Sequence, residues 1–159
     1  MRVLSHAMSG IAIGERAPDF TLQGTGGDFT LSAHHGEIVV LLFYPGDETP
    51  VCTKQFCSYR ETGLEGLGAT VVGISAQDLE SHQRFTDHHG LTVPLLADID
   101  KAVAKSYGAA APLLGTRRAV VVIDEEGVVR FKHVHRLGLD YLDADQLRDA
   151  VAHAYGATA

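Results

Sequence analysis

The feature that most constrains the fold is an uninterrupted apolar run at residues 38–44, which reads IVVLLFY. A strand with one exposed face alternates polar and apolar residues, whereas this run has no polar interruption. Such a run is typical of a strand that helices cover on both faces. The sequence therefore predicts an α/β domain built around this strand.

The segment after this run predicts a helix with a thiol in its first turn. Thr49 is suited to cap the helix, and Pro50 suits the first helical position, which needs no N–H. We expect the helix to begin at Pro50 and to end near Gly66. In its first turn, backbone N–H groups lack helical partners and the helix dipole favours negative charge. A thiolate at Cys52 and an incoming polar oxygen would both be stabilised there.

The remaining patterns predict a succession of strands and helices. We expect an early hairpin that returns through residues 29–31, strands at 69–75, 95–97, 118–124 and 128–134, and helices at 78–89, 101–107 and 144–154. This order predicts a sheet with a parallel part built by right-handed crossovers. Residues 1–13 show no clear periodicity, so we interpret them as a loose leader in which Met8 is an alternative start. Residues 14–159 are expected to form a single domain.

Composition argues against two broad classes of function. The 159 residues include 13 Lys and Arg against 20 Asp and Glu, which gives a net charge of −7. A general nucleic-acid binder needs a basic face, so no nucleic-acid partner is expected. No apolar run approaches the ~20 residues of a membrane span, so no membrane role is expected either.

Both cysteines of the chain, Cys52 and Cys57, lie in this predicted helix, so any thiol chemistry must occur there. Two cysteines are too few for a disulfide scaffold, and the first residues lack the sustained apolar core of a signal peptide. We therefore expect a cytoplasmic protein. In a reducing compartment, neighbouring cysteines are more often catalytic, redox-active or metal-binding than structural.

The residues around the cysteines resemble the peroxiredoxins, in particular the PrxQ or bacterioferritin comigratory protein branch. Pro45, Thr49 and Cys52 meet the family pattern Pro-x-x-x-Thr-x-x-Cys, and Cys57 stands at the resolving position of this branch. The resemblance extends from about residue 14 to about residue 155. It implies a thioredoxin-like fold, with a central mixed sheet flanked by helices and an N-terminal hairpin extension.

The resemblance also implies an activity and a role for each motif residue. The protein would be a thiol-dependent peroxidase for hydrogen peroxide and organic hydroperoxides, acting as a monomer or weak homodimer without cofactor or metal. Cys52 would attack the peroxide, and Cys57 would resolve the sulfenic acid to a disulfide that thioredoxin or a similar dithiol reductant reopens. Thr49 would bind the peroxide, and Pro45 would shield the thiolate from water.

A cation is expected beside the thiol, because the negative charges of Asp47 and Glu48 would disfavour a nearby thiolate. Spacing alone leaves four candidates, namely Lys54, Arg60, Arg117 and Arg118. The resemblance implies Arg118, since the family arginine stands six residues before the Asp of an Ile-Asp-x-x-Gly turn, here Asp124. Arg60 matches a further family arginine and is otherwise interpreted as a surface charge.

Other functions are compatible with two cysteines. A thiol-disulfide oxidoreductase on the same fold would use a CxxC dithiol, which the five-residue step from Cys52 to Cys57 does not provide. A non-enzymatic redox sensor needs no more than the two thiols. The nine histidines invite a metal hypothesis, but none has the spacing of a known ligand set with the cysteines, so no metal is expected.

Overall fold

The structure is a computed structural model that describes residues 10–64, 66–111, 115–135 and 141–158. Its centre is a five-stranded mixed sheet with the strand order β5-β4-β3-β8-β9. The strands are β3 (Ile38–Phe43), β4 (Ala69–Ser75), β5 (Leu95–Ala97), β8 (Ala119–Ile123) and β9 (Val129–Val134). β3 pairs in parallel with β4 and antiparallel with β8, and this arrangement confirms the predicted central strand and mixed sheet.

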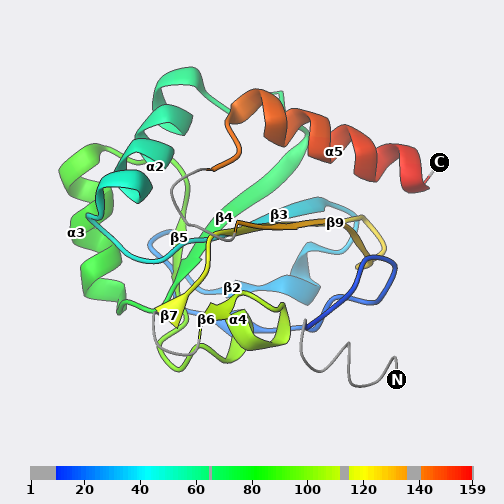
Figure 1. Ribbon diagram of the computed structural model, residues 1–159, viewed down its shortest axis with the longest axis horizontal. Coiled ribbons are helices and arrows are strands. Elements are labelled where there is room, and N and C mark those ends of the chain that lie inside the picture. Colours follow the sequence, from blue (N-terminus) through cyan, green and yellow to red (C-terminus); the bar gives the residue numbers. More distant parts are fainter. Residues whose placement is uncertain (1–9, 65, 112–114, 136–140, 159) are drawn as a thin grey trace.

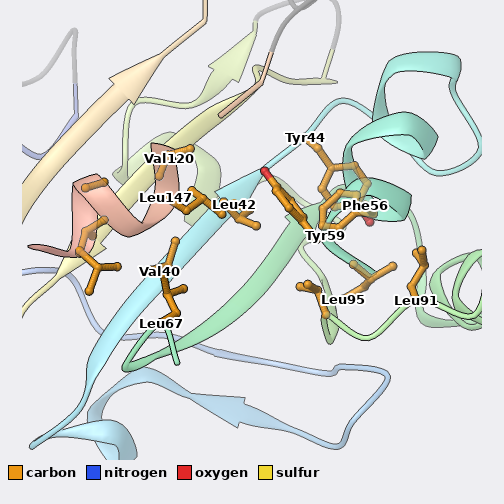
Figure 2. Close-up of a cluster of buried hydrophobic side chains, with 14 of the residues drawn as sticks. Val40, Leu42, Tyr44, Phe56, Tyr59, Leu67, Leu91, Leu95, Val120 and Leu147 are labelled. Carbon is orange, nitrogen blue, oxygen red and sulfur yellow. The ribbon is translucent and has the colours of Figure 1, made fainter. Parts of the chain in front are cut away.

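β3 is buried at all six positions, and its alternating side chains supply two separate cores. Ile38, Val40 and Leu42 pack against α2 (Pro50–Thr62), α3 (Leu79–His89) and α5 (Ala144–Thr158) on one face. Figure 2 shows this cluster, in which Val40 and Leu42 of β3 lie near Leu147 of α5 and Tyr59 of α2.

The opposite face of the sheet is covered by α4 (Ala102–Ser106) and the N-terminal hairpin (Figure 1). The hairpin pairs β1 (Thr21–Leu22) with β2 (Phe29–Thr30), as predicted, and leads into the 3-10 helix η1 (Leu31–His34). A further small antiparallel sheet of β6 (Ala110–Ala111) and β7 (Gly115–Thr116) was not predicted. The two covered faces explain why the central run contains no polar residue.

A glycine ends each of the helices α2 and α3. α2 ends at Thr62 rather than near Gly66, because Gly63 adopts a φ of 79° and donates its N–H to the Tyr59 carbonyl. A positive φ is easily adopted by glycine, and here it stops the helix about one turn before the expected end. α3 ends as predicted, with Gly90 in the left-handed conformation.

Most of the predicted leader, including Met8, lies outside the described residues. Within the described part of the chain, we find no helix that combines the length and the apolar character needed to span a bilayer.

Candidate active site

Cys52 lies in the first turn of α2, where its side chain is completely buried. The Nη2 atom of Arg118 donates a hydrogen bond to its sulfur at 3.2 Å. Arg118 immediately precedes β8, and the pairing of Phe43 with Ala119 brings this strand end next to the loop that leads into α2. The structure therefore brings together the thiol and one of the four cations that spacing left open.

The guanidinium of Arg118 is itself fixed by a buried chain of hydrogen bonds. Its Nη1 atom donates to the side-chain oxygen of Gln55, and Gln55 donates through Nε2 to the hydroxyl of Tyr59 at 3.0 Å. That hydroxyl donates in turn to the carbonyl of Leu142 at 2.5 Å. With 2% of its surface exposed, Arg118 presents a positive charge, permanent at any working pH, to the sulfur in a fixed orientation.

Gln55 and Tyr59 were missed as functional residues by the sequence analysis. Their positions held a usable signal, because Gln55 follows Cys52 by three residues and Tyr59 follows Gln55 by four. Residues at these spacings lie on the same face of a helix. A buried glutamine on the face of the reactive thiol needs a polar partner, and here that partner is the arginine.

Thr49 occupies the N-cap position, but the predicted capping hydrogen bond is wrong. Its hydroxyl instead donates to the carbonyl of Gly46 at 2.9 Å, because the loop turns this carbonyl toward the hydroxyl. The carbonyl of Thr49 accepts the backbone N–H of Thr53. Since the proton of Thr49 is engaged, its oxygen has lone pairs with which to accept a hydrogen bond from a bound ligand.

Pro45 precedes Cys52 in the sequence and Cys57 follows it. Pro45 is half-buried in the loop between β3 and α2. Cys57 is half-buried one and a half turns after Cys52 in the same continuous helix, and both thiols are free. Pro45 thus lies in the loop before α2 and Cys57 lies in the middle of the helix, and the two sulfurs are not joined.

The carboxylates of Asp47 and Glu48 hydrogen-bond to histidines, while the cation expected beside the thiol is Arg118. Asp47 accepts hydrogen bonds from Tyr44, Ser81 and His82, each at 2.7 Å. Burial would raise the pKa of Asp47, but the bonds from His82 and Ser81 outweigh burial and hold this pKa below its usual value. Burial also raises the pKa of Tyr44 well above its usual range, and the charge of Asp47 adds to this effect.

His82 is fully buried, with Nδ1 facing the Asp47 carboxylate and Nε2 lying 3.0 Å from the carbonyl of Leu96. Asp47 therefore finds its partner in α3, whereas Arg118 faces the sulfur of Cys52.

The other candidate cations do not reach Cys52. Arg60 is exposed and donates to the carbonyl of His89 and, at 3.1 Å, to Glu61, which agrees with its interpretation as a surface charge. Lys54 and Arg117 are also exposed. The described site therefore places a buried thiol beside a fixed guanidinium and at a helix N-terminus, two features that stabilise a thiolate nucleophile.

Comparison with known proteins identifies a family that matches this chain. Residues 13–132 match the AhpC/TSA family. The chain is 41% identical to peroxiredoxin Q, a chloroplastic protein of Oryza sativa subsp. japonica, over 76% of the chain and 58% of that relative. It is 37% identical to a peroxiredoxin of Thermoplasma volcanium over 76% of the chain and 64% of that relative. The chain thus spans less than two thirds of the length of these curated relatives.

A solved structure agrees with the sequence comparisons. The peroxidoxin BcpB from Mycobacterium tuberculosis superposes with a TM-score of 0.75 at 29% identity, covering 92% of this chain and 97% of that one.

Proposed function

Because the chain belongs to the AhpC/TSA family, we propose that it is a thiol-dependent peroxidase that reduces hydrogen peroxide and organic hydroperoxides. The observation that carries this proposal is the hydrogen bond from the Arg118 guanidinium to the buried Cys52 sulfur. A buried thiol without a cation would remain protonated and inert, whereas this contact favours the thiolate that attacks a peroxide.

In the first step, the Cys52 thiolate attacks one oxygen of the hydroperoxide. A sulfur–oxygen bond forms, the oxygen–oxygen bond breaks, and an alcohol or water leaves after taking up a proton. Sulfur gives up two electrons and becomes a sulfenic acid. Arg118 can stabilise the negative charge that develops on the leaving oxygen, and the Thr49 oxygen can accept the hydrogen of the peroxide.

In the second step, the Cys57 thiol condenses with the sulfenic acid of Cys52. A disulfide forms and one water molecule leaves, which protects Cys52 from further oxidation. A dithiol reductant, thioredoxin or a similar protein, then reduces this disulfide by thiol-disulfide exchange, and the two thiols of the reductant become a disulfide. A reducing compartment such as the cytoplasm would supply that reductant, and either a monomer or a weak homodimer is compatible with the mechanism.

Turnover in a coupled assay tests this function. Protein, thioredoxin, thioredoxin reductase and NADPH are mixed, and NADPH consumption is followed after adding hydrogen peroxide or an organic hydroperoxide. We expect consumption that depends on peroxide and is abolished in Cys52→Ser. A single stoichiometric oxidation without turnover would favour a redox sensor. Disulfide reduction without peroxide consumption would favour a thiol-disulfide oxidoreductase.

A further inference from the structure

Glu48, His88 and His89 form a cluster of potential metal ligands beside the loop that leads into α2. His88 Nδ1 lies 2.9 Å from Oε2 of Glu48, and His89 Nε2 lies 2.8 Å from Oε1. One ligand atom from each residue lies within 4.8 Å of the other two. Two imidazoles and a carboxylate are a common protein ligand set for zinc and similar ions.

Local contacts and backbone conformation position Glu48 and His89. Glu48 has a φ of 60°, in the left-handed region that residues other than glycine rarely adopt. On the other side, the His89 ring packs edge-on against Phe85 with the ring centroids 5.4 Å apart. The carbonyl of His89 accepts a hydrogen bond from Arg60. His89 is therefore anchored before any ligand binds.

The charges around the cluster favour a cation. The adjacent surface hollow is lined by Asp87 and Asp47 as well as Glu48 and His88. Arg84 also lines it, but Glu80 pairs with its guanidinium at 2.8 Å. His88 is exposed, so an ion can enter from solvent.

We propose that Glu48, His88 and His89 bind a divalent transition-metal ion of the zinc type, with water completing a four-coordinate site. Ligand atoms about 2.0–2.2 Å from zinc lie roughly 3.4 Å apart in a tetrahedron, so small side-chain rotations would close the present cluster around an ion. The ion would replace the protons that now bridge the imidazoles and the carboxylate. The sequence analysis could not find this site, because forty residues separate Glu48 from His88.

Occupancy of this site would restrain the catalytic helix. Glu48 immediately precedes Thr49, so an ion would tie the entry to α2 to the end of α3. This consequence rests on the proposed function, in which the first turns of α2 must move for the disulfide to form. The metal site itself does not depend on that function.

Zinc binding is best measured on a protein without thiols, since cysteines also bind zinc. We would titrate Zn²⁺ into the Cys52→Ser, Cys57→Ser double variant by calorimetry, and then into the same protein carrying Glu48→Gln or His89→Gln. We expect one ion per chain and at least a tenfold loss of affinity in each of the two added variants. The matched control is His133→Gln, because His133 and His135 form another histidine pair, with ring centroids 4.4 Å apart.

Equal zinc affinity in the Glu48 and His89 variants, or loss of binding in the His133 variant, would overturn the proposal. A second measurement avoids these substitutions. Co²⁺ added to the double variant should broaden amide NMR signals near residues 48 and 88–89 before those near 133–135, and the reverse order would also overturn the proposal. Neither the zinc titration nor the cobalt NMR measurement depends on peroxidase turnover. Failure of the proposed metal site can therefore be distinguished from failure of the proposed function.

Discussion

Arg118 donates a hydrogen bond to the sulfur of Cys52 at 3.2 Å, although 66 positions separate the two residues in the chain. The sheet makes this contact possible, because β3 and β8 are antiparallel neighbours and the end of one meets the start of the other. Cys52 lies in the first turn of α2, the helix that follows β3, while Arg118 stands just before β8. Cys52, the proposed nucleophile, and Arg118 therefore meet at one end of the central strands.

Replacing Arg118 by alanine should slow peroxide reduction by about a hundredfold, the order of effect seen when one electrostatic donor is removed from an active site. The thiolate loses its hydrogen-bond donor and positive charge, so alkylation of Cys52 by a neutral reagent should require higher pH. The matched control is Arg117→Ala, which removes an exposed charge one residue away. If the rate and the alkylation profile of Arg118→Ala both equalled those of this control, another cation would have to act on the sulfur.

Replacing Gln55 by alanine should also slow peroxide reduction, by about tenfold. The variant removes the acceptor for Arg118 Nη1 and the donor to Tyr59, so the guanidinium loses its fixed orientation. Leaving a buried donor unsatisfied also costs about 1–3 kcal/mol of stability. The pH profile of Cys52 alkylation separates the two effects, because a purely structural role would change the unfolding free energy without moving the profile. Gln83→Ala, at an exposed glutamine of α3, is the control.

The fold could be predicted well because its signals are local. The run at residues 38–44 identified the buried central strand, and Pro50 marked the start of α2. The end of α2 was misplaced because Gly63, Gly66 and Gly68 all adopt a positive φ, and local sequence does not show which of them ends the helix.

The site could be predicted only in part, because its polar partners come from distant segments. The cysteines and Thr49 belong to one short motif, and family resemblance implied Arg118. The pairing of Asp47 with His82 joins a loop to a helix 35 residues away, so no spacing rule revealed it. The hydroxyl of Thr49 donates to the carbonyl of Gly46 in the loop and does not accept a backbone N–H at the start of the helix. Which of these two hydrogen bonds forms depends on the geometry of the loop, and the residue type alone does not reveal it.

Asp124 should make stability depend on pH in a defined direction. Its carboxylate accepts the N–H groups of Glu126 and Val128 and, at 2.7 Å, the guanidinium of Arg130. Burial would raise the pKa of Asp124, but these bonds outweigh burial and hold the pKa below its usual value. A lowered pKa in the folded protein gives stability that is present above the unfolded value and lost as the pH falls through the folded value.

Asp124→Asn should therefore lower the unfolding free energy at pH 7 by about 1 kcal/mol, since a hydrogen bond to a charged group exceeds a neutral one by this order. The difference from wild type should shrink as the pH falls below about 4. Urea unfolding at pH 7 and at about pH 3 would measure it, with the exposed Asp28→Asn as control. A difference that grew toward acid pH would contradict this assignment.

Formation of a disulfide between Cys52 and Cys57 should unwind the start of α2. Positions five apart in a helix have Cα atoms roughly 8 to 9 Å apart, whereas a disulfide tolerates about 7 Å at most. Amide hydrogen exchange should therefore become faster on oxidation at about residues 51–59, while α5 keeps its protection as an internal control. Unaltered protection of α2 in a protein with a proven disulfide would show that the helix does not need to open.

The proposed mechanism gives the two cysteines different roles, so their variants should behave differently. Cys52→Ser should abolish peroxide reduction, because it removes the nucleophile that Arg118 activates. Cys57→Ser should retain the first oxidation and lose recycling by thioredoxin, because no thiol remains to condense with the sulfenic acid.

Mass spectrometry of Cys57→Ser and of wild type after one equivalent of hydrogen peroxide tests this assignment most directly. The variant should carry a sulfenic acid or its overoxidised forms on Cys52, and wild type should carry a disulfide between Cys52 and Cys57. In the matched experiment on Cys52→Ser, the remaining Cys57 should stay unmodified. Oxidation of Cys57 in that variant, together with an unmodified Cys52 in the Cys57 variant, would contradict the assignment of Cys52 as the peroxide-reducing thiol.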